Sequence, residues 1–366
     1  MQWVNRIQHA LDEVRFCRYG HPFTQLLPKK LSKQMTSRYT SVLNSNVNFN
    51  DHAFLLFDPT MSHFIIALVP VLVLIFIGYG LKRISFISDD VWAGIEKITY
   101  YVMFPALLVQ NIGRQNIHGT PWQEMFLVVF IVLIIAAASL LLLYKIQDQM
   151  TAKTFTSVFQ GGIRFNTYIA FSISAAFYGK EGLGLAAISA GFMIVLVNFL
   201  CVGIFVFFGN NAASSGKAFV KQILLNPLIL ACVVGWCLSL SGIGLPGVSA
   251  DILEILGRAA LPIGLMAVGA ALKPRLIKGH FKDIISASTM QFLLKPALVI
   301  LLCALLNLPT LVTGVLLIAF ISPTASSAYI LARQLGGDVE AMASIITLQT
   351  ILAFLVMPLW AYWFLV

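Results

Sequence analysis

The sequence predicts an all-α polytopic membrane protein whose ten transmembrane helices form two inverted five-helix repeats. Three observations lead to this fold class: the composition is very apolar, ten long apolar runs follow one another, and landmarks in the two halves of the chain keep a constant offset. Of the 366 residues, 59% are hydrophobic and only 11% are charged. That composition is far too apolar for a soluble domain and is typical of an integral membrane protein.

The ten apolar runs begin after Met61, and each is long enough to cross a bilayer core, which takes about 20 residues in a helix. They lie near residues 62–81, 93–112, 122–144, 156–178, 184–208, 222–241, 250–272, 284–306, 309–333 and 341–364. Lys and Arg gather in the loops after the odd-numbered runs. By the positive-inside rule these loops face the cytoplasm and both termini lie on the non-cytoplasmic side. This spread of the +9 formal charge is unlike a phosphate-binding stripe, so no nucleic acid partner is expected.

The chain outside these runs sets the expected organisation. Residues 1–60 are polar and contain no span. Two interpretations stay open for them: a disordered extension, or residues translated from an upstream start codon that do not belong to the native chain. We expect the first five-helix repeat at 61–208, a polar cytoplasmic linker at 209–221, and the second, inverted repeat at 222–366.

The repeat itself is visible as a constant offset between landmark residues. An offset of 157 separates Pro70 from Pro227, Pro105 from Pro262, Thr167 from Thr324, and Gly179 from Gly336. Because five is an odd number of spans, the second copy must enter the membrane from the opposite face. This inverted-topology repeat is the architecture of many secondary transporters.

The fourth apolar run is interrupted by residues 160–168, which contain two glycines among polar side chains. A guanidinium such as that of Arg164 costs on the order of 3 kcal/mol near the centre of a membrane helix, even on the lenient insertion scale. The glycines weaken the helix, so we expect it to break and to present a half-helix N-terminus to an anion. Gln160, Arg164, Asn166 and Thr167 are therefore candidate substrate-binding residues.

The ninth run has a matching interruption at residues 321–329, where a proline lies among hydroxyl side chains. Proline removes one backbone hydrogen bond and leaves carbonyls that neighbouring Ser and Thr can satisfy. As the repeat partner of the first break, this one is expected to complete the site. Its candidate substrate-binding residues are Pro323, Thr324, Ser326 and Ser327.

Lys295 is a second deep cation without a local carboxylate, as Arg164 is, and an excess of such cations indicates an anionic substrate. Lys295 is therefore a further candidate for substrate binding. An alternative stays open, in which it snorkels or bonds carbonyls left by Pro296. Glu254 and Arg258 are spaced four apart on one helix and are expected to pair with each other.

Signatures of catalysis are missing from the sequence: it contains no Walker loop, no metal-binding cluster of His and Cys, and no nucleophile elbow. We therefore expect neither an enzyme nor a cofactor nor a metal site. The five cysteines lack metal-ligand spacing and are expected to be packing residues. They are Cys17, Cys201, Cys232, Cys237 and Cys303.

Several motifs taken together carry a family resemblance. They are Gln160-Gly-Gly-Ile-Arg164-Phe-Asn166-Thr, Asn226-Pro227, Leu261-Pro262-Ile-Gly-Leu-Met-Ala-Val-Gly-Ala, and Pro323-Thr-Ala-Ser-Ser-Ala-Tyr with Leu335-Gly-Gly-Asp338. In these motifs the chain resembles the auxin efflux carrier family over about residues 61–366. The resemblance implies helix crossovers in spans four and nine, a scaffold of spans one, two, six and seven beside a mobile domain, and commonly a homodimer. It also implies a carboxylate substrate, because bacterial members are permeases for malonate and malate and plant members export auxin.

One motif of the plant members is only partly kept. Their crossover in span four contains a Pro-Asn-Thr triplet whose asparagine contacts the carboxylate, and here the triplet reads Phe165-Asn166-Thr167. The role of the asparagine carries over to Asn166, but the proline is absent. The break must then depend on Gly161 and Gly162 or on the polar side chains around them.

The expected function is that of a secondary transporter in the cell inner membrane, which moves a small carboxylate anion by elevator-type alternating access. Two alternatives stay open. One is a sodium-coupled carrier of the bile-acid type, which shares the inverted-repeat plan. The other is an anion channel or a receptor without active transport.

Overall fold

The computed structural model describes residues 59–115, 119–147, 150–208, 224–245, 247–277 and 279–365. Within these ranges the chain forms helices and short connections, without a β-strand. The predicted linker and, apart from its last two residues, the predicted N-terminal extension lie outside the described residues.

Four helices are long and uninterrupted, and apolar residues make up most of their sequences. They are α3 (Pro59–Arg83), α6 (Trp122–Ile146), α11 (Val248–Ala271) and α16 (Val339–Leu365). The shorter α10 (Pro227–Leu240) starts at a proline, and Asn226 caps it by accepting a hydrogen bond from the backbone N–H of Leu228.

Two further long helices each contain a π-helical turn just before a proline. The first consists of α4 (Asp89–Ile98), η3 (Thr99–Met103) and α5 (Phe104–Gly113); the second of α12 (Phe281–Thr289), η6 (Met290–Leu294) and α13 (Lys295–Leu305). Pro105 and Pro296 stand near the start of α5 and α13. Because proline has no N–H and its ring clashes with the carbonyl four residues back, the extra residue of a π-turn relieves the conflict.

The two interruptions expected in the apolar runs are real breaks. The first separates α7 (Ala152–Ile163) from α8 (Thr167–Phe208), and the second separates α14 (Thr310–Ile321) from α15 (Ser327–Leu335). Within α8, Gly179 has φ 65° and ψ −150°, so this element consists of two helices that meet at a glycine. The short 3₁₀ turn η5 (Pro274–Leu276) follows α11.

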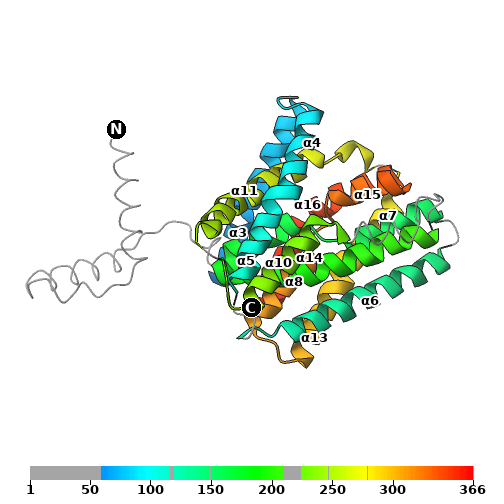
Figure 1. The fold of residues 1–366 in the computed structure, drawn as a ribbon. Helices are drawn as coiled ribbons and strands as arrows, with labels where there is room; N and C mark the ends of the chain where they lie inside the picture. The colour runs from blue at the N-terminus through cyan, green and yellow to red at the C-terminus, as the bar shows by residue number, and fades with distance from the viewer. Residues whose placement is uncertain are drawn as a thin grey trace, which may run out of the picture. The chain divides into compact units, whose positions relative to one another are not determined.

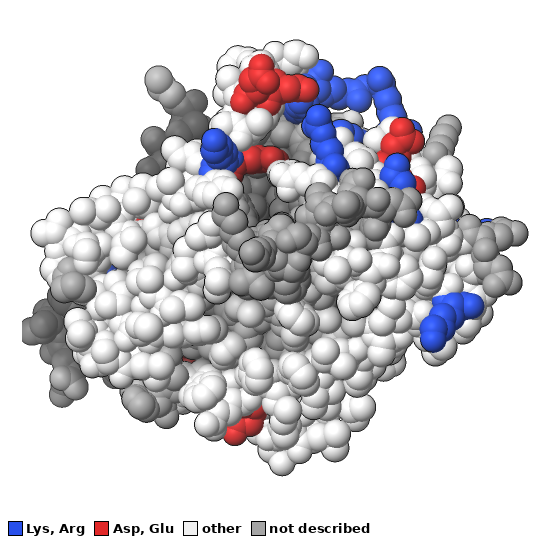
Figure 2. Space-filling model, turned by 45° about the vertical axis from the view of Figure 1, so that its right-hand side comes forward, with Lys and Arg blue, Asp and Glu red and all other residues white. Residues whose placement is uncertain are grey.

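Six helical segments among the described residues are long and apolar enough to cross a membrane: His63–Arg83, Trp122–Ile146, Ala152–Phe208, Val248–Ala271, Phe281–Leu305 and Val339–Phe364. Large apolar side chains on them are exposed, among them Phe76, Leu142, Phe207, Leu355 and Trp363. Figure 2 shows a broad flank almost without Lys, Arg, Asp or Glu, while charged side chains gather toward one edge. An apolar flank of this kind suits contact with lipid, and the chain is a multi-pass membrane protein.

The helices pack in two groups. In the first, α11 lies along α3 and α5, and α10 packs on α5 (Figure 1). In the second, α8 packs on α6 and α14, and α7 packs on α12 and α16. Glycines allow α3 and α11 to approach closely, because a Cβ on Gly78 would lie 1.9 Å from the carbonyl oxygen of Met266, and one on Gly269 would lie 1.9 Å from that of Ile75.

Candidate functional site

The two broken helices meet at their breaks. The Thr324 hydroxyl donates a hydrogen bond to the Gly161 carbonyl at 2.7 Å. The same carbonyl accepts from Gln349 Nε2 at 3.0 Å, and Gln349 Oε1 accepts from the Thr324 backbone N–H at 3.0 Å. Backbone groups that lose their helical partners at the breaks are therefore satisfied across the two halves of the chain.

The glycines before the first break allow α7 to pack closely on neighbouring helices. A Cβ on Gly161 would lie 2.7 Å from Ile345 Cγ2, and a Cβ on Gly162 would lie 2.9 Å from Leu140 Cδ1. The chain then becomes extended at Arg164, with φ −69° and ψ 160°. The break thus forms without the proline that the plant triplet has.

Lys295 lies directly behind the breaks and is fully buried. Its ammonium donates to the Ile163 carbonyl, with an N–O distance of 3.4 Å, and to Gln291 Oε1 at 2.5 Å. Gln291 Nε2 in turn donates to the carbonyls of Phe320 and Ser322. The negative ends of α7 and α14 are therefore both capped by this pair, which accounts for a buried cation with no carboxylate partner among the described residues. The alternative that Lys295 snorkels is wrong, since the side chain does not reach solvent. The alternative that it bonds carbonyls left by Pro296 is also wrong, since its hydrogen bonds go to α7 and to Gln291.

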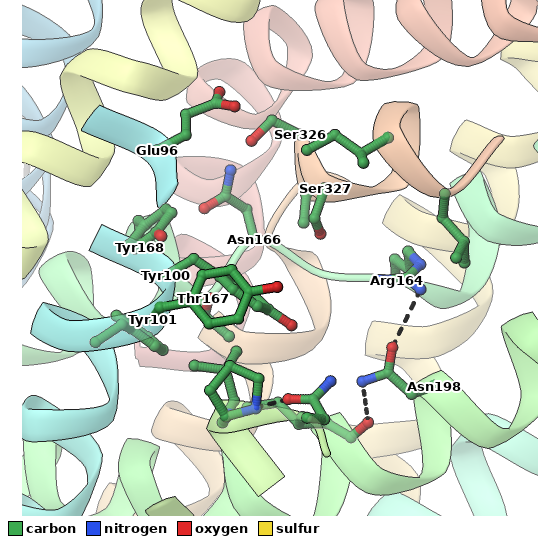
Figure 3. Close-up of a pocket in the computed structure, with 18 of the residues that line it drawn as sticks. Glu96, Tyr100, Tyr101, Arg164, Asn166, Thr167, Tyr168, Asn198, Ser326 and Ser327 are labelled. Carbon is green, nitrogen blue, oxygen red and sulfur yellow. Dashed lines mark hydrogen bonds between the residues drawn. The ribbon is translucent and has the colours of Figure 1, made fainter. Parts of the chain in front are cut away.

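A pocket of about 750 Å³ lies on the other side of the breaks (Figure 3). Of the nine predicted site residues, the five that line it are Arg164, Asn166, Thr167, Ser326 and Ser327. The other four, Gln160, Pro323, Thr324 and Lys295, are absent from its wall. Of these four, Gln160, Thr324 and Lys295 bond to other parts of the break region.

Arg164 places a buried positive charge in the pocket wall, with only 8% of its surface exposed. Its Nε donates to Gln160 Oε1 at 3.1 Å, and its Nη2 donates to Asn198 Oδ1 at 3.2 Å. Asn198 is itself held by a bond from its Nδ2 to the Ile194 carbonyl. No carboxylate in the described part of the chain pairs with this guanidinium. Its orientation is thus fixed by two amides, while its positive charge stays uncompensated.

Asn166 offers a second donor to the pocket. Its Oδ1 accepts a hydrogen bond from the Ile169 backbone N–H at 3.2 Å and so caps α8, whose N-terminal end points at the pocket region. Its Nδ2 is buried and has no hydrogen-bond partner within the described structure. A buried donor of this kind is costly to leave unsatisfied, by about 1–3 kcal/mol, and an anionic ligand would satisfy it.

Sequence reasoning missed the opposite wall of the pocket. This wall comes from α4, η3 and α8, and its labelled members in Figure 3 are Glu96, Tyr100, Tyr101 and Tyr168. A signal was available, because Glu96 and Tyr100 stand four residues apart and share one helix face. A single acid near the end of an apolar run looks interfacial, however, and nothing local in the sequence places it against a break that lies beyond the third span.

Polar residues elsewhere behave more simply. Arg258 pairs with Glu254 as predicted, and Arg114 also donates to Glu254, at 3.0 Å. Of the four cysteines in the described ranges, Cys201, Cys232 and Cys303 are buried, as packing residues are, and Cys237 is exposed. Cys17 lies outside the described residues.

Comparison with known proteins identifies the family of the chain. The model of the membrane transport protein family matches residues 63–361. An uncharacterized transporter of Methanothermobacter thermautotrophicus is 22% identical over 294 residues, covering 80% of this chain and 95% of its own length. An uncharacterized transporter of Methanocaldococcus jannaschii is 25% identical over 305 residues, covering 80% of this chain and 96% of its own. The chain is a membrane transporter, not an enzyme, and it belongs to the membrane transport protein family, that of the auxin efflux carriers.

Proposed function

We propose that this protein is a secondary transporter that moves a small carboxylate anion by alternating access. The observation that carries the proposal is the uncompensated Arg164 guanidinium in the pocket wall, together with the unsatisfied Nδ2 of Asn166 in the same wall. Two charge-assisted donors on an extended backbone, next to the N-terminal end of α8, suit a carboxylate. Thr167, Ser326 and Ser327 add hydroxyls to the same wall, and with them the ligand can replace its hydration shell.

The remaining candidate residues have a supporting part in this proposal. Gln160 orients Arg164, and Thr324 joins the breaks. Lys295 neutralises the carbonyl ends of α7 and α14 from behind. Pro323 interrupts the ninth span between α14 and α15. These four side chains shape the site, and the substrate itself contacts the pocket wall.

The helix positions support ten crossings in two inverted repeats. Helix α7 begins and ends 158 residues before α14 does, since 310 − 152 and 321 − 163 both equal 158. Gly179 and Gly336, which are 157 residues apart, both have positive φ, at 65° and 79°. On this plan α10, the paired α7 and α8, and the paired α14 and α15 all cross the membrane, although α10 and α14 are short.

The pocket's position supports an elevator motion. Its wall combines residues of the α3, α5, α10 and α11 group, such as Phe104 and Ala267, with residues at the two breaks. A site at the border between two helix groups changes its exposure when one group slides along the other. We therefore assign the first group as the scaffold and the second as the moving part.

The exposed residues at the pocket rim indicate which side is open. Ala93, Lys97, Leu225 and Gln334 line the pocket and are solvent-exposed. Each lies near a loop that follows an odd-numbered span, and the positive-inside rule assigns these loops to the cytoplasm. We therefore infer an inward-facing conformation, in an inner-membrane protein with both termini outside. A homodimer is proposed from the family resemblance alone.

The sodium-coupled alternative has less support. Half-helix carbonyl ends are where such carriers coordinate the cation, and here the Lys295 ammonium and the Gln291 amide already bond the carbonyls at the ends of α7 and α14. A carrier that holds a built-in cation at this position has no need of a sodium ion there.

Counterflow in proteoliposomes tests the proposed function. Purified protein is reconstituted with an internal mono- or dicarboxylate, and uptake of the labelled compound is measured with and without proton and sodium gradients. Saturable exchange of at least one carboxylate is expected. Unsaturable conductance would indicate a channel, and the absence of both exchange and conductance would indicate a receptor.

A further inference from the structure

The pocket contains a carboxylate that the binding of a simple anion does not need. Glu96 of α4 lines the pocket and is half-buried. Within the described structure no Lys or Arg forms an ion pair with it, since nearby Lys82 pairs with Asp89 instead. Lys97 also lines the pocket, but it is exposed at the rim. An ionised carboxylate inside a half-buried site repels an anionic ligand and attracts a positive group.

The position of Glu96 is separate from that of Arg164. In Figure 3, Glu96 and the labelled tyrosines lie on one side of the view, Arg164 and Asn198 lie on the other, and Asn166 lies nearer to Glu96. The two charges come from different helix groups, because Glu96 belongs to α4 and Arg164 follows α7. The pocket is therefore polarised, with one acidic end and one basic end.

The acidic end has the chemistry of an ammonium site. A carboxylate accepts charge-assisted hydrogen bonds from N–H groups, and the faces of aromatic rings attract a nearby cation. Tyr100, Tyr101, Phe104 and Tyr168 all line the pocket, and the first three follow Glu96 on the same long helix. The ring of Tyr168 is held edge-on against Phe104, with centroids 5.0 Å apart, so this aromatic wall is packed in place.

We propose that the transported carboxylate is a zwitterion, an amino acid or a related amino-carboxylate, whose ammonium group binds Glu96 while its carboxylate binds Arg164 and Asn166. This inference rests on the proposed function and names the substrate class of the same site. The volume of about 750 Å³ leaves room for an apolar side chain against the tyrosines, and it lies within the roughly 300–1,000 Å³ typical of small-molecule sites.

Matched substrate pairs test the inference. Counterflow is measured for 3-phenylpropanoate against phenylalanine, and for butanoate against 2-aminobutanoate and 4-aminobutanoate. In at least one pair the amino compound is expected to have a kcat/KM about tenfold higher, which corresponds to about 1.4 kcal/mol. Exchange of the carboxylates that lack an amino group, without exchange of their amino partners, overturns the inference and leaves the proposed function standing. Exchange of neither class overturns both.

The Glu96→Gln variant links the preference to the side chain. It keeps the size of Glu96 and one acceptor oxygen but removes the charge, so kcat/KM for the amino compound is expected to fall about tenfold. Exchange of the partner that lacks an amino group is expected to persist, which also shows that the variant is folded. Asp90→Asn makes the same chemical change on the exposed side of α4, outside the pocket, and is expected to leave both rates unchanged.

The same variant also tests a competing role for Glu96, that of a proton-binding site. If Glu96 serves as a proton site, Glu96→Gln removes the effect of a proton gradient on every substrate alike, and the preference between paired substrates stays as it was. That outcome contradicts the zwitterion inference. If the variant does not fold, the substrate pairs measured on the unaltered protein decide the question alone.

Discussion

The Thr324 hydroxyl hydrogen bonds to the Gly161 carbonyl, and this bond of 2.7 Å joins the break in one half of the chain to the break in the other. The two residues are 163 positions apart in the sequence. Gln349 strengthens the junction by bonding to both of them. The side chains proposed to donate hydrogen bonds to the substrate carboxylate are thus held on a backbone that these hydrogen bonds fix in place.

Replacement of Thr324 by Val should weaken this junction. Because Gln349 still satisfies the Gly161 carbonyl, the expected cost is that of one buried hydrogen bond, about 1 kcal/mol. Thermal unfolding in detergent, followed by tryptophan fluorescence, should show a lower midpoint for Thr324→Val. Thr324→Ser keeps the hydroxyl and should stay close to the unaltered protein. Equal midpoints for Val and Ser would show that the bond contributes nothing.

The scaffold should be very sensitive to a methyl group at Gly78. A Cβ there would lie 1.9 Å from a backbone oxygen of α11, which cannot move without displacing the helix. We expect Gly78→Ala to destabilise the protein by about 1–3 kcal/mol or more and to reduce the folded peak in fluorescence-detected size exclusion. Gly80→Ala, on the same helix with nothing within 4 Å of the new Cβ, is the matched control and should be neutral or stabilising. Similar peaks for the two variants would contradict the close packing of α3 on α11.

Transport should not depend on sodium. The carbonyl ends of α7 and α14 are already capped by Lys295 and Gln291, so no cation is needed there. Exchange rates in proteoliposomes should be equal when sodium is replaced by choline. A rate that rises with sodium concentration would favour the bile-acid type of carrier.

Replacement of Lys295 by Met should destabilise the crossing region, although Lys295 does not line the pocket. Methionine fills a similar volume but leaves the Ile163 carbonyl and Gln291 Oε1 without this donor, at a cost of about 1–3 kcal/mol. The unfolding midpoint should fall accordingly. Lys180→Met, at an exposed position, should have almost no effect. A stability equal to that of the control would show that the buried ammonium is not needed at the helix ends.

The helix breaks could be predicted from the sequence because each is a local anomaly. The first break combines glycines with an arginine and an asparagine, and the second has a proline among hydroxyl side chains. Such residues do not belong in an apolar run unless the helix ends there. The roles of the residues within each break could not be predicted in the same way. An extended segment has no helical period to tell its two sides apart, so Thr324 and Ser326 looked equivalent although only Ser326 lines the pocket.

The partners of the deep polar residues were also beyond the reach of sequence reasoning. Lys295 meets the carbonyl of Ile163, which lies 132 positions away, and a backbone oxygen leaves no mark in the sequence. Glu96 reaches the pocket because α4, which packs on α11, forms part of its wall, and this depends on tertiary structure alone. The acid at Glu96 therefore looked like an ordinary residue near a membrane end.

The counterflow rate of the Arg164→Ala and Asn166→Ala variants tests the carboxylate site most directly. Each variant removes one donor from the pocket wall, and Asn166→Ala also removes the cap of α8. A charge-assisted hydrogen bond is worth about 1.5–3 kcal/mol, so exchange should fall by about tenfold or more. Arg258→Ala removes an arginine that pairs on the surface with Glu254, and it should exchange carboxylate at the unaltered rate. If folded Arg164→Ala and Asn166→Ala proteins also exchange carboxylate at the unaltered rate, neither residue binds the substrate.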